Sequence, residues 1–256
     1  MVRGVIFTGA YYILSVFYVL MAMLSLPLPG RAAVRFVIRS YTRAVRLALR
    51  FIGGISIEYR GRGHLPEGPF IIAAKHQSWG DGIVLYPEID NLAFVTGDHL
   101  ERFPLLGRIL RKLGAIVIDT CGGGDRKAKS LAEGMERAKS EDVRILIYPE
   151  GHLAAPGTYY RYKPGVWHMQ RAMDVPVIPV ATNLGCYWQQ QEMAKTPGRA
   201  VVQFLEPIPA DLPKSEFLEL LTRRIEETSA SLLSEARHTE TQKALLLPDP
   251  QKVRTS

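Results

Sequence analysis

The sequence has few cysteines and no clustered set of metal-ligand residues. Its only cysteines, Cys121 and Cys186, do not suggest a disulfide framework and favour a reducing compartment. The histidines are scattered, so no zinc site is indicated, and we expect neither a metal nor another cofactor. No internal repeat or low-complexity tract occurs. The 256 residues therefore fit one α/β domain with an appended segment.

Charge is missing from one long stretch near the N-terminus. Val5 to Leu28 runs for about 24 positions without a charged residue, which is enough to cross a bilayer core. A secretory signal peptide is the rival interpretation, but no small-x-small cleavage site precedes a plausible mature start. The sequence therefore predicts a helix embedded in the membrane.

Acidic residues are outnumbered, and the net charge is +7, so an anionic partner is expected. Six arginines follow Leu28 at helical spacing: Arg31, Arg35, Arg39, Arg43, Arg46 and Arg50. They form one stripe, which predicts a basic amphipathic helix on an anionic membrane, facing the cytoplasm at the inner membrane. The alternative is a charged helix face packed on the domain. No aromatic-rich basic strand or recognition helix points to nucleic acid.

From residue 53 onward, short apolar runs alternate with helical patterns. The pattern predicts helices over Phe103–Leu113, Asp125–Lys139, Pro164–Met173 and Ser215–Glu235. It predicts strands over Ile55–Tyr59, Phe70–Ala74, Leu92–Thr96, Ala115–Asp119, Val143–Tyr148, Val177–Ala181 and Ala200–Leu205. Strands that are apolar on both faces predict an α/β fold with a mostly parallel sheet flanked by helices. We therefore expect a helical segment at 1–52, a domain at 53–237 and a loose polar tail at 238–256.

His76 and Asp81 form the clearest chemical pattern in the chain. His76 follows the predicted strand Phe70–Ala74, and Asp81 starts a short predicted helix ending at Tyr86. A turn at Gly80 can bring the carboxylate onto the imidazole, which fixes the tautomer and leaves the other nitrogen free to accept a proton. The alternative is a helix-capping aspartate beside a surface histidine.

Two further groups lie in loops that can line the same crevice. Glu150 and Gly151 directly follow a buried strand, and ligands bind at the carboxyl ends of strands in open α/β sheets. Glu150 can instead cap a neighbouring backbone. Arg161 and Lys163 precede a helix N-terminus, where cations and amides can bind an anion together.

Four blocks in this order resemble the H-x4-D glycerolipid acyltransferases, particularly the bacterial 1-acyl-sn-glycerol-3-phosphate acyltransferases. The blocks are His76–Asp81, Gly114–Asp119, Tyr148–Gly151 and Val175–Val180, within residues 55–210. The resemblance implies an α/β domain on a membrane-embedded N-terminal helical segment. It also implies acyl transfer from acyl-CoA or acyl carrier protein to the free sn-2 hydroxyl of 1-acyl-sn-glycerol-3-phosphate, giving phosphatidic acid in phospholipid biosynthesis.

The resemblance also implies roles for individual residues. His76 is expected to take the hydroxyl proton, and Asp81 to orient His76, without an acyl-enzyme. Nearby backbone amides could stabilise the oxyanion, and Gly80 and Gly151 would let the backbone approach it closely.

The chain departs from the family pattern at two positions that usually carry arginine for the acceptor's phosphate. Thr120 and Leu153 occupy them, the latter after His152. Arg126, Lys127, Arg161 and Lys163 are possible replacements, and we expect Arg126, Arg161 and Lys163 to contact substrate together with Glu150 and Gly151. Alternatively, the acceptor is a lysolipid without glycerol phosphate, such as lyso-ornithine lipid. A non-catalytic membrane-surface scaffold is a third interpretation.

Overall fold

The computed structural model describes residues 2–97, 104–118, 124–189, 193 and 195–246. Its seven-stranded sheet has the order β1-β7-β6-β2-β5-β3-β4. The strands are β1 (Ile55–Arg60), β2 (Ile71–Ala74), β3 (Leu92–Gly97), β4 (Ile116–Ile118), β5 (Arg144–Ile147), β6 (Val177–Thr182) and β7 (Gly198–Phe204). Neighbouring strands are parallel except β6 and β7. The predicted mostly parallel α/β sheet is therefore confirmed.

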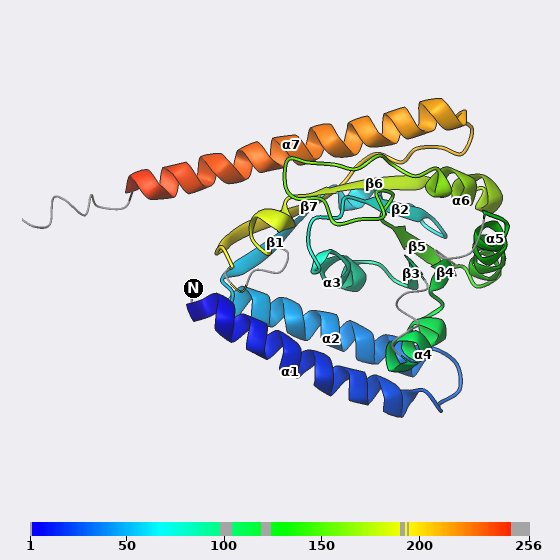
Figure 1. Ribbon diagram of the computed structural model, residues 1–256, viewed down its shortest axis with the longest axis horizontal. Coiled ribbons are helices and arrows are strands. Elements are labelled where there is room, and N and C mark those ends of the chain that lie inside the picture. The colour runs from blue at the N-terminus through cyan, green and yellow to red at the C-terminus, as the bar shows by residue number, and fades with distance from the viewer. Residues whose placement is uncertain (1, 98–103, 119–123, 190–192, 194, 247–256) are drawn as a thin grey trace, which may run out of the picture.

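Helices cover both faces of the sheet (Figure 1). They are α1 (Val2–Ser25), α2 (Ala32–Phe51), α3 (Asp81–Leu85), α4 (Pro104–Leu113), α5 (Gly124–Ser140), α6 (Gly165–Met173) and α7 (Lys214–Leu246). Side chains alternate along each strand, so consecutive strand residues enter different cores. Ile72 and Leu146 belong to the core beneath α1, α2 and α3, whereas Ile71 and Ile145 belong to the core beneath α5, α6 and α7.

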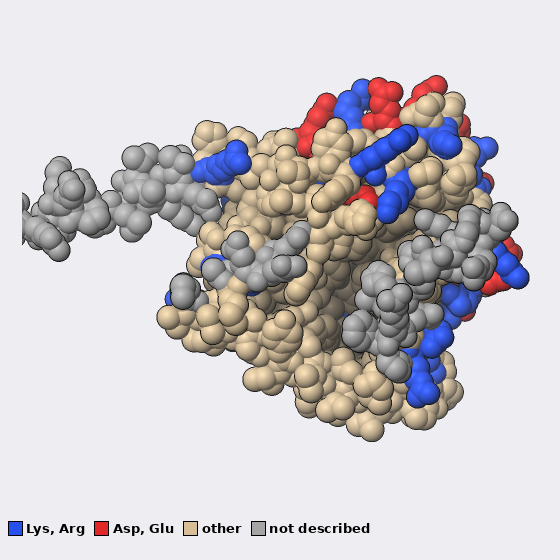
Figure 2. All heavy atoms as spheres, in the orientation of Figure 1, with Lys and Arg blue, Asp and Glu red and all other residues tan. Residues whose placement is uncertain are grey.

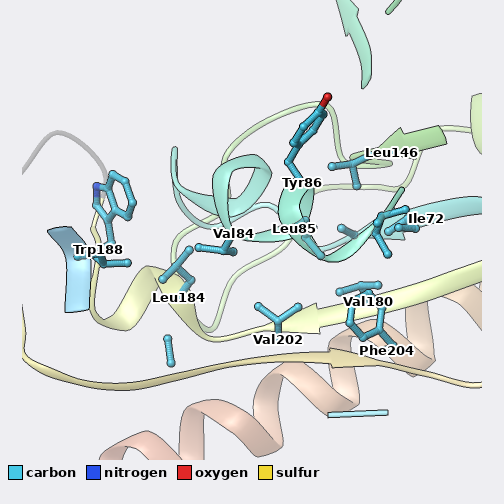
Figure 3. Close-up of a cluster of buried hydrophobic side chains, with 14 of the residues drawn as sticks. Ile72, Val84, Leu85, Tyr86, Leu146, Val180, Leu184, Trp188, Val202 and Phe204 are labelled. Carbon is cyan, nitrogen blue, oxygen red and sulfur yellow. The ribbon is translucent and has the colours of Figure 1, made fainter. Parts of the chain in front are cut away.

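The first of these cores fixes the short helix α3 above the sheet. Figure 3 shows Val84 and Leu85 of α3 grouped with Ile72, Val180 and Val202 from the strands. Val84 and Leu85 are almost fully buried. Burial of side chains of this size stabilises by about 1.5–3 kcal/mol each, which holds a five-residue helix too short to persist alone.

The N-terminal helices form a hairpin against the domain. Helix α1 is long and apolar enough to cross a membrane by length and composition, as predicted. Residues on its outer side, including Ile13, Val16 and Leu24, are strongly exposed. Its inner side contributes Phe7 to the domain core, and α2 contributes Val45 and Leu49. The division expected at residue 52 therefore does not separate two cores.

The arginine stripe on α2 differs from the prediction of a membrane-facing row. Arg31 pairs with Glu141, Arg39 with Asp90 and Arg46 with Glu88, all within the domain. Of the six arginines, Arg43 and Arg50 are exposed. The spacing predicted one face correctly, but charge alone could not distinguish acidic protein surface from acidic lipid. The alternative, a charged face packed on the domain, describes most of the stripe.

The C-terminal helix is longer than predicted. Helix α7 continues to Leu246, so a loose tail from His238 is wrong for residues 238–246. This segment is polar but contains no glycine or proline, and its Glu, Gln, Lys, Ala and Leu residues favour helix. Pro248 and Pro250 lie in the last ten residues, which are outside the described part of the chain.

Candidate active site

The register of β2 and β5 brings two sequence blocks to one edge of the sheet. These strands are parallel, with Ala73 opposite Ile147, so both chains leave the sheet at the same end. His76 follows β2 and Tyr148 follows β5, and their side chains share the α3 face. The amide of Ala154 donates to the carbonyl of His76 at 2.7 Å, which joins the second loop to the first.

His76 and Asp81 form the predicted pair. With Nδ1 carrying the proton, His76 donates to Asp81 Oδ2 at 2.9 Å. The same oxygen accepts hydrogen bonds from the amides of Gln77 and Ser78 at 2.7 and 2.8 Å. Only 2% of the Asp81 side chain is exposed, against 22% of the His76 side chain. The carboxylate is thus fixed by its own loop, and Nε2 of His76 makes no hydrogen bond to any described residue.

Two aromatic rings pack against the turn that joins His76 to Asp81. The Tyr148 ring stacks on the imidazole of His76, with centroids 3.8 Å apart and planes at 13°. Trp188 packs under Gly80, where any Cβ would clash with its indole ring. Only glycine can therefore occupy position 80 without moving Trp188.

Glu150 differs from its predicted role as a substrate contact. It is 0% exposed, and its carboxylate accepts a hydrogen bond from the Tyr160 amide at 2.8 Å. Its other oxygen lies 3.1 Å from Lys75 Nζ, as an ion pair whose geometry is not a hydrogen bond. Burial raises the pKa of Glu150, and the Tyr160 amide and Lys75 oppose this shift. Glu150 therefore supports the loop from within, as the capping alternative anticipated.

The two predicted cations lie on the surface of the same loop. Arg161 and Lys163 are exposed, and neither side chain forms an ion pair or hydrogen bond with a described residue. Lys163 packs over Gly151, whose φ of 69° and lack of a Cβ permit that contact. The Lys163 amide donates to the carbonyl of Pro149 at 2.9 Å, which closes the loop. Among the described residues, neither cation has a partner that would compete with an anion.

The remaining predicted site positions are Gly80, Gly151 and Arg126. The amides of Gly80 and Gly151 already donate to Ser78 Oγ and the Tyr148 carbonyl, at 3.1 and 3.0 Å. The close backbone approach that these two glycines are predicted to permit stays a prediction. Arg126 lies in α5, but its side chain, like that of Lys127 and all of Thr120, is outside the described residues.

The surface over this edge is hollowed. Figure 2 shows the hollow where Figure 1 places α3, with Lys and Arg along its upper side and largely uncharged surface below, over α1 and α2. Within the described residues, no cluster of His, Cys, Asp and Glu could hold a metal ion. The described residues thus offer an oriented imidazole, two cations without a partner among them, and a largely uncharged margin.

Sequence reasoning missed four residues around this site: Lys75, Tyr148 as a stacking partner, Tyr162 and Glu226. The position of Lys75 could have indicated its role, since a lysine directly after a buried apolar strand requires a charged partner. Glu226 offered none, because it lies far along the chain on α7.

The sequence and the fold of the chain match those of known proteins. Residues 56–183, half of the chain, match the family model described as acyltransferase. The chain therefore belongs to the acyltransferase family, as its motifs predicted. It is 32% identical over 171 residues to the 1-acyl-sn-glycerol-3-phosphate acyltransferase of Pseudomonas aeruginosa, covering 67% of this chain and 66% of that protein.

Two other proteins bear on the acceptor and on the fold. The lyso-ornithine lipid O-acyltransferase of Pseudomonas aeruginosa is 32% identical over 104 residues, covering 40% of this chain and 38% of that protein. The crystal structure of the 1-acyl-sn-glycerophosphate acyltransferase of Thermotoga maritima superposes with a TM-score of 0.73. The superposition covers 90% of this chain and 96% of the Thermotoga chain at 20% identity, and so establishes the shared fold.

Proposed function

We propose that this protein transfers an acyl group from an acyl thioester to the sn-2 hydroxyl of 1-acyl-sn-glycerol-3-phosphate, producing phosphatidic acid. The observation that carries the proposal is the His76–Asp81 pair, whose His76 Nε2 has no hydrogen-bond partner among the described residues. The loop that stacks Tyr148 on His76 also carries two exposed cations, Arg161 and Lys163. The family of the chain and its similarity to the Pseudomonas enzyme support this acceptor. The donor is acyl-CoA or acyl carrier protein.

The proposed step is direct attack by the lipid hydroxyl. His76 Nε2 takes the hydroxyl proton while the oxygen attacks the thioester carbonyl. The buried Asp81 carboxylate stabilises the imidazolium through Nδ1. Collapse of the tetrahedral intermediate breaks the carbon–sulfur bond, and the imidazolium returns the proton to the departing thiolate. An oxygen ester and a free thiol result, and the protein is unchanged.

Arg161 and Lys163 are the proposed phosphate ligands. They are exposed and unpaired among the described side chains, and Lys163 packs over Gly151 in the loop that also stacks Tyr148 on His76. Charge-assisted hydrogen bonds to a phosphate are the strongest that such side chains form. They would hold the glycerol backbone beside the base.

The membrane face is proposed to be the outer side of α1 with the exposed residues of α2. Both helices lie along the domain rather than leaving it (Figure 1), so insertion into the cytoplasmic leaflet of the inner membrane fits better than a full crossing. The hollow over α3 then opens near the lipid surface, where a lysolipid acceptor is found.

The alternative acceptor is lyso-ornithine lipid. Leu153 in place of a family arginine and the similarity to the Pseudomonas lyso-ornithine lipid acyltransferase favour it. Incubating the purified protein with both lysolipids, and with acyl-CoA or acyl carrier protein as donors, decides the matter by mass spectrometry of the products. A higher kcat/KM for lyso-ornithine lipid would overturn the proposed acceptor and leave the His76 chemistry intact.

A further inference from the structure

Lys75 and His76 point to opposite sides of the sheet. They are consecutive at the end of β2, so alternation sends His76 toward α3 and Lys75 toward the core beneath α7. Lys75 is 1% exposed. A buried ammonium is costly unless it is paired, so the groups around Lys75 determine where the end of β2 can lie.

Helix α7 supplies the main partner. Lys75 Nζ donates to both carboxylate oxygens of Glu226, at 2.9 and 3.1 Å. It also donates to the carbonyl of Thr158 at 2.8 Å and lies 3.1 Å from Glu150 Oε1. The Lys75 ammonium thus links the end of β2, one residue before His76, to the loop after β5 and to α7.

Glu226 also holds the loop that carries the two cations. The hydroxyl of Tyr162 donates to Glu226 Oε1 at 2.7 Å. Burial and the adjacent Glu226 raise the pKa of Tyr162 far above its usual range, so the phenol stays a donor. Tyr162 is buried and lies between Arg161 and Lys163, whose side chains are exposed.

We propose that Glu226 is a positioning residue that sets two parts of the active site at once: His76 through Lys75, and the Arg161–Lys163 cation pair through Tyr162. Glu226 lies outside the matched family region of 56–183, so this role belongs to the C-terminal helix of this chain. The proposal rests on the proposed function for its kinetic consequences. Its structural consequence, a loosened loop at 148–163, does not depend on the substrate.

The kinetic test compares Glu226→Ala with Glu227→Ala in the full-length protein. Glu227 is the neighbouring residue on α7, is exposed and has no side-chain partner among the described residues, so it controls for charge and helix propensity. We expect Glu226→Ala to lower kcat and raise KM for the lysolipid, with kcat falling on the order of 10²-fold, as for a displacement of about 1 Å. Kinetics for Glu226→Ala that equal those of Glu227→Ala would overturn the proposal.

Two further variants separate positioning from general stability. Glu226→Gln keeps an acceptor for both Lys75 and Tyr162, so it should recover most of the lost kcat. Tyr162→Phe removes only the hydrogen bond from Tyr162 to Glu226 and leaves the Lys75–Glu226 contact in place. It should therefore raise KM for the phosphate-bearing lysolipid with little effect on kcat. Equal losses of kcat in Tyr162→Phe and Glu226→Ala would contradict separate roles for the Lys75 and Tyr162 contacts of Glu226. They would point instead to a common loss of stability.

Hydrogen exchange of the loop gives a readout that needs no substrate. Peptides covering 148–163 contain the Tyr160 and Lys163 amides, which donate to Glu150 and Pro149. We expect faster exchange of these peptides in Glu226→Ala than in Glu227→Ala, with β6 and β7 unchanged. If that occurs and the protein uses no phosphate-bearing acceptor, the proposed function falls and the positioning role stands. Unchanged exchange in a folded Glu226→Ala protein would refute the positioning role itself.

Discussion

The ring of Tyr148 lies 3.8 Å from the imidazole of His76, and the two planes differ by 13°. The contact fixes the imidazole on one face while Asp81 fixes its edge. The phenol oxygen is buried and forms no hydrogen bond with the described residues. Burial, reinforced by the nearby Asp81 charge, raises the pKa of Tyr148 well above 10, so the phenol is neutral. The ring of Tyr148, and not its hydroxyl, therefore supports the imidazole of His76.

Tyr148→Phe should keep near-normal kcat, because it retains the stacked ring. It should also preserve or raise the melting temperature, since it removes an unpaired buried hydroxyl whose desolvation costs roughly 1–3 kcal/mol. Tyr148→Leu should lower kcat, because the imidazole then loses its flat support. Thermal melts and steady-state kinetics of both variants provide the measurement. A large activity loss in Tyr148→Phe would show that the hydroxyl takes part.

His76→Ala should nearly abolish acyl transfer while the protein still folds. Loss of a general base costs about 10²–10⁴-fold in rate. Asp81→Asn should also impair turnover, because it removes the charge that stabilises the imidazolium and favours the wrong tautomer. Initial rates are compared at equal amounts of folded protein, judged by circular dichroism. Near-normal turnover by His76→Ala would eliminate the proposed mechanism.

Replacing Arg161 and Lys163 by Gln should lower kcat/KM for lysophosphatidic acid, because each charge-assisted contact is worth roughly 1.5–3 kcal/mol. Lyso-ornithine lipid should be less affected. Arg223→Gln is the matched control, since Arg223 is exposed on α7 and has no side-chain partner among the described residues. If the double variant uses lysophosphatidic acid as well as the control does, the phosphate lies elsewhere. If Thr120→Arg and Leu153→Arg then improve the use of lysophosphatidic acid, its phosphate lies near positions 120 and 153.

The arginines of α2 should divide into two groups in membrane binding. Arg43→Gln and Arg50→Gln should weaken binding to anionic vesicles more than to neutral ones, at about 1 kcal/mol per cation near an anionic surface. Arg46→Gln should instead lower the melting temperature, because Arg46 pairs with Glu88 and donates to Tyr59 within the domain. Vesicle sedimentation and thermal melts separate the two effects. Equal loss on both vesicle types would exclude an electrostatic role for Arg43 and Arg50.

Local pattern was sufficient for most of the fold and for the contact between His76 and Asp81. Apolar runs marked all seven strands, and the five-residue spacing of His76 and Asp81 indicated their contact. Both depend on neighbours in the chain, which periodicity and turn chemistry describe. The end of α7 is not predicted by polarity, because residues 238–246 are polar and yet contain good helix formers.

The remainder of the site depends on distant pairings that periodicity does not encode. Glu226 is 151 positions from Lys75, and Glu141 is 110 positions from Arg31. Spacing identified the basic face of α2 but not the acidic groups opposite it. Likewise, the position of Glu150 at a strand end suggested the ligand crevice, whereas its carboxylate contacts the Tyr160 amide and the buried Lys75.

Helix α1 packs against the tryptophan that supports the turn between His76 and Asp81. Trp188, on which Gly80 rests, meets Phe7 and Tyr11 of α1 edge-on, at centroid distances of 5.1 and 5.6 Å. A detergent that separates α1 from the domain therefore removes Phe7 and Tyr11 from Trp188. The turn at Gly80 then loses part of its support. Activity retained after extraction reports how well α1 stays docked, so detergents should be ranked by turnover and not by yield.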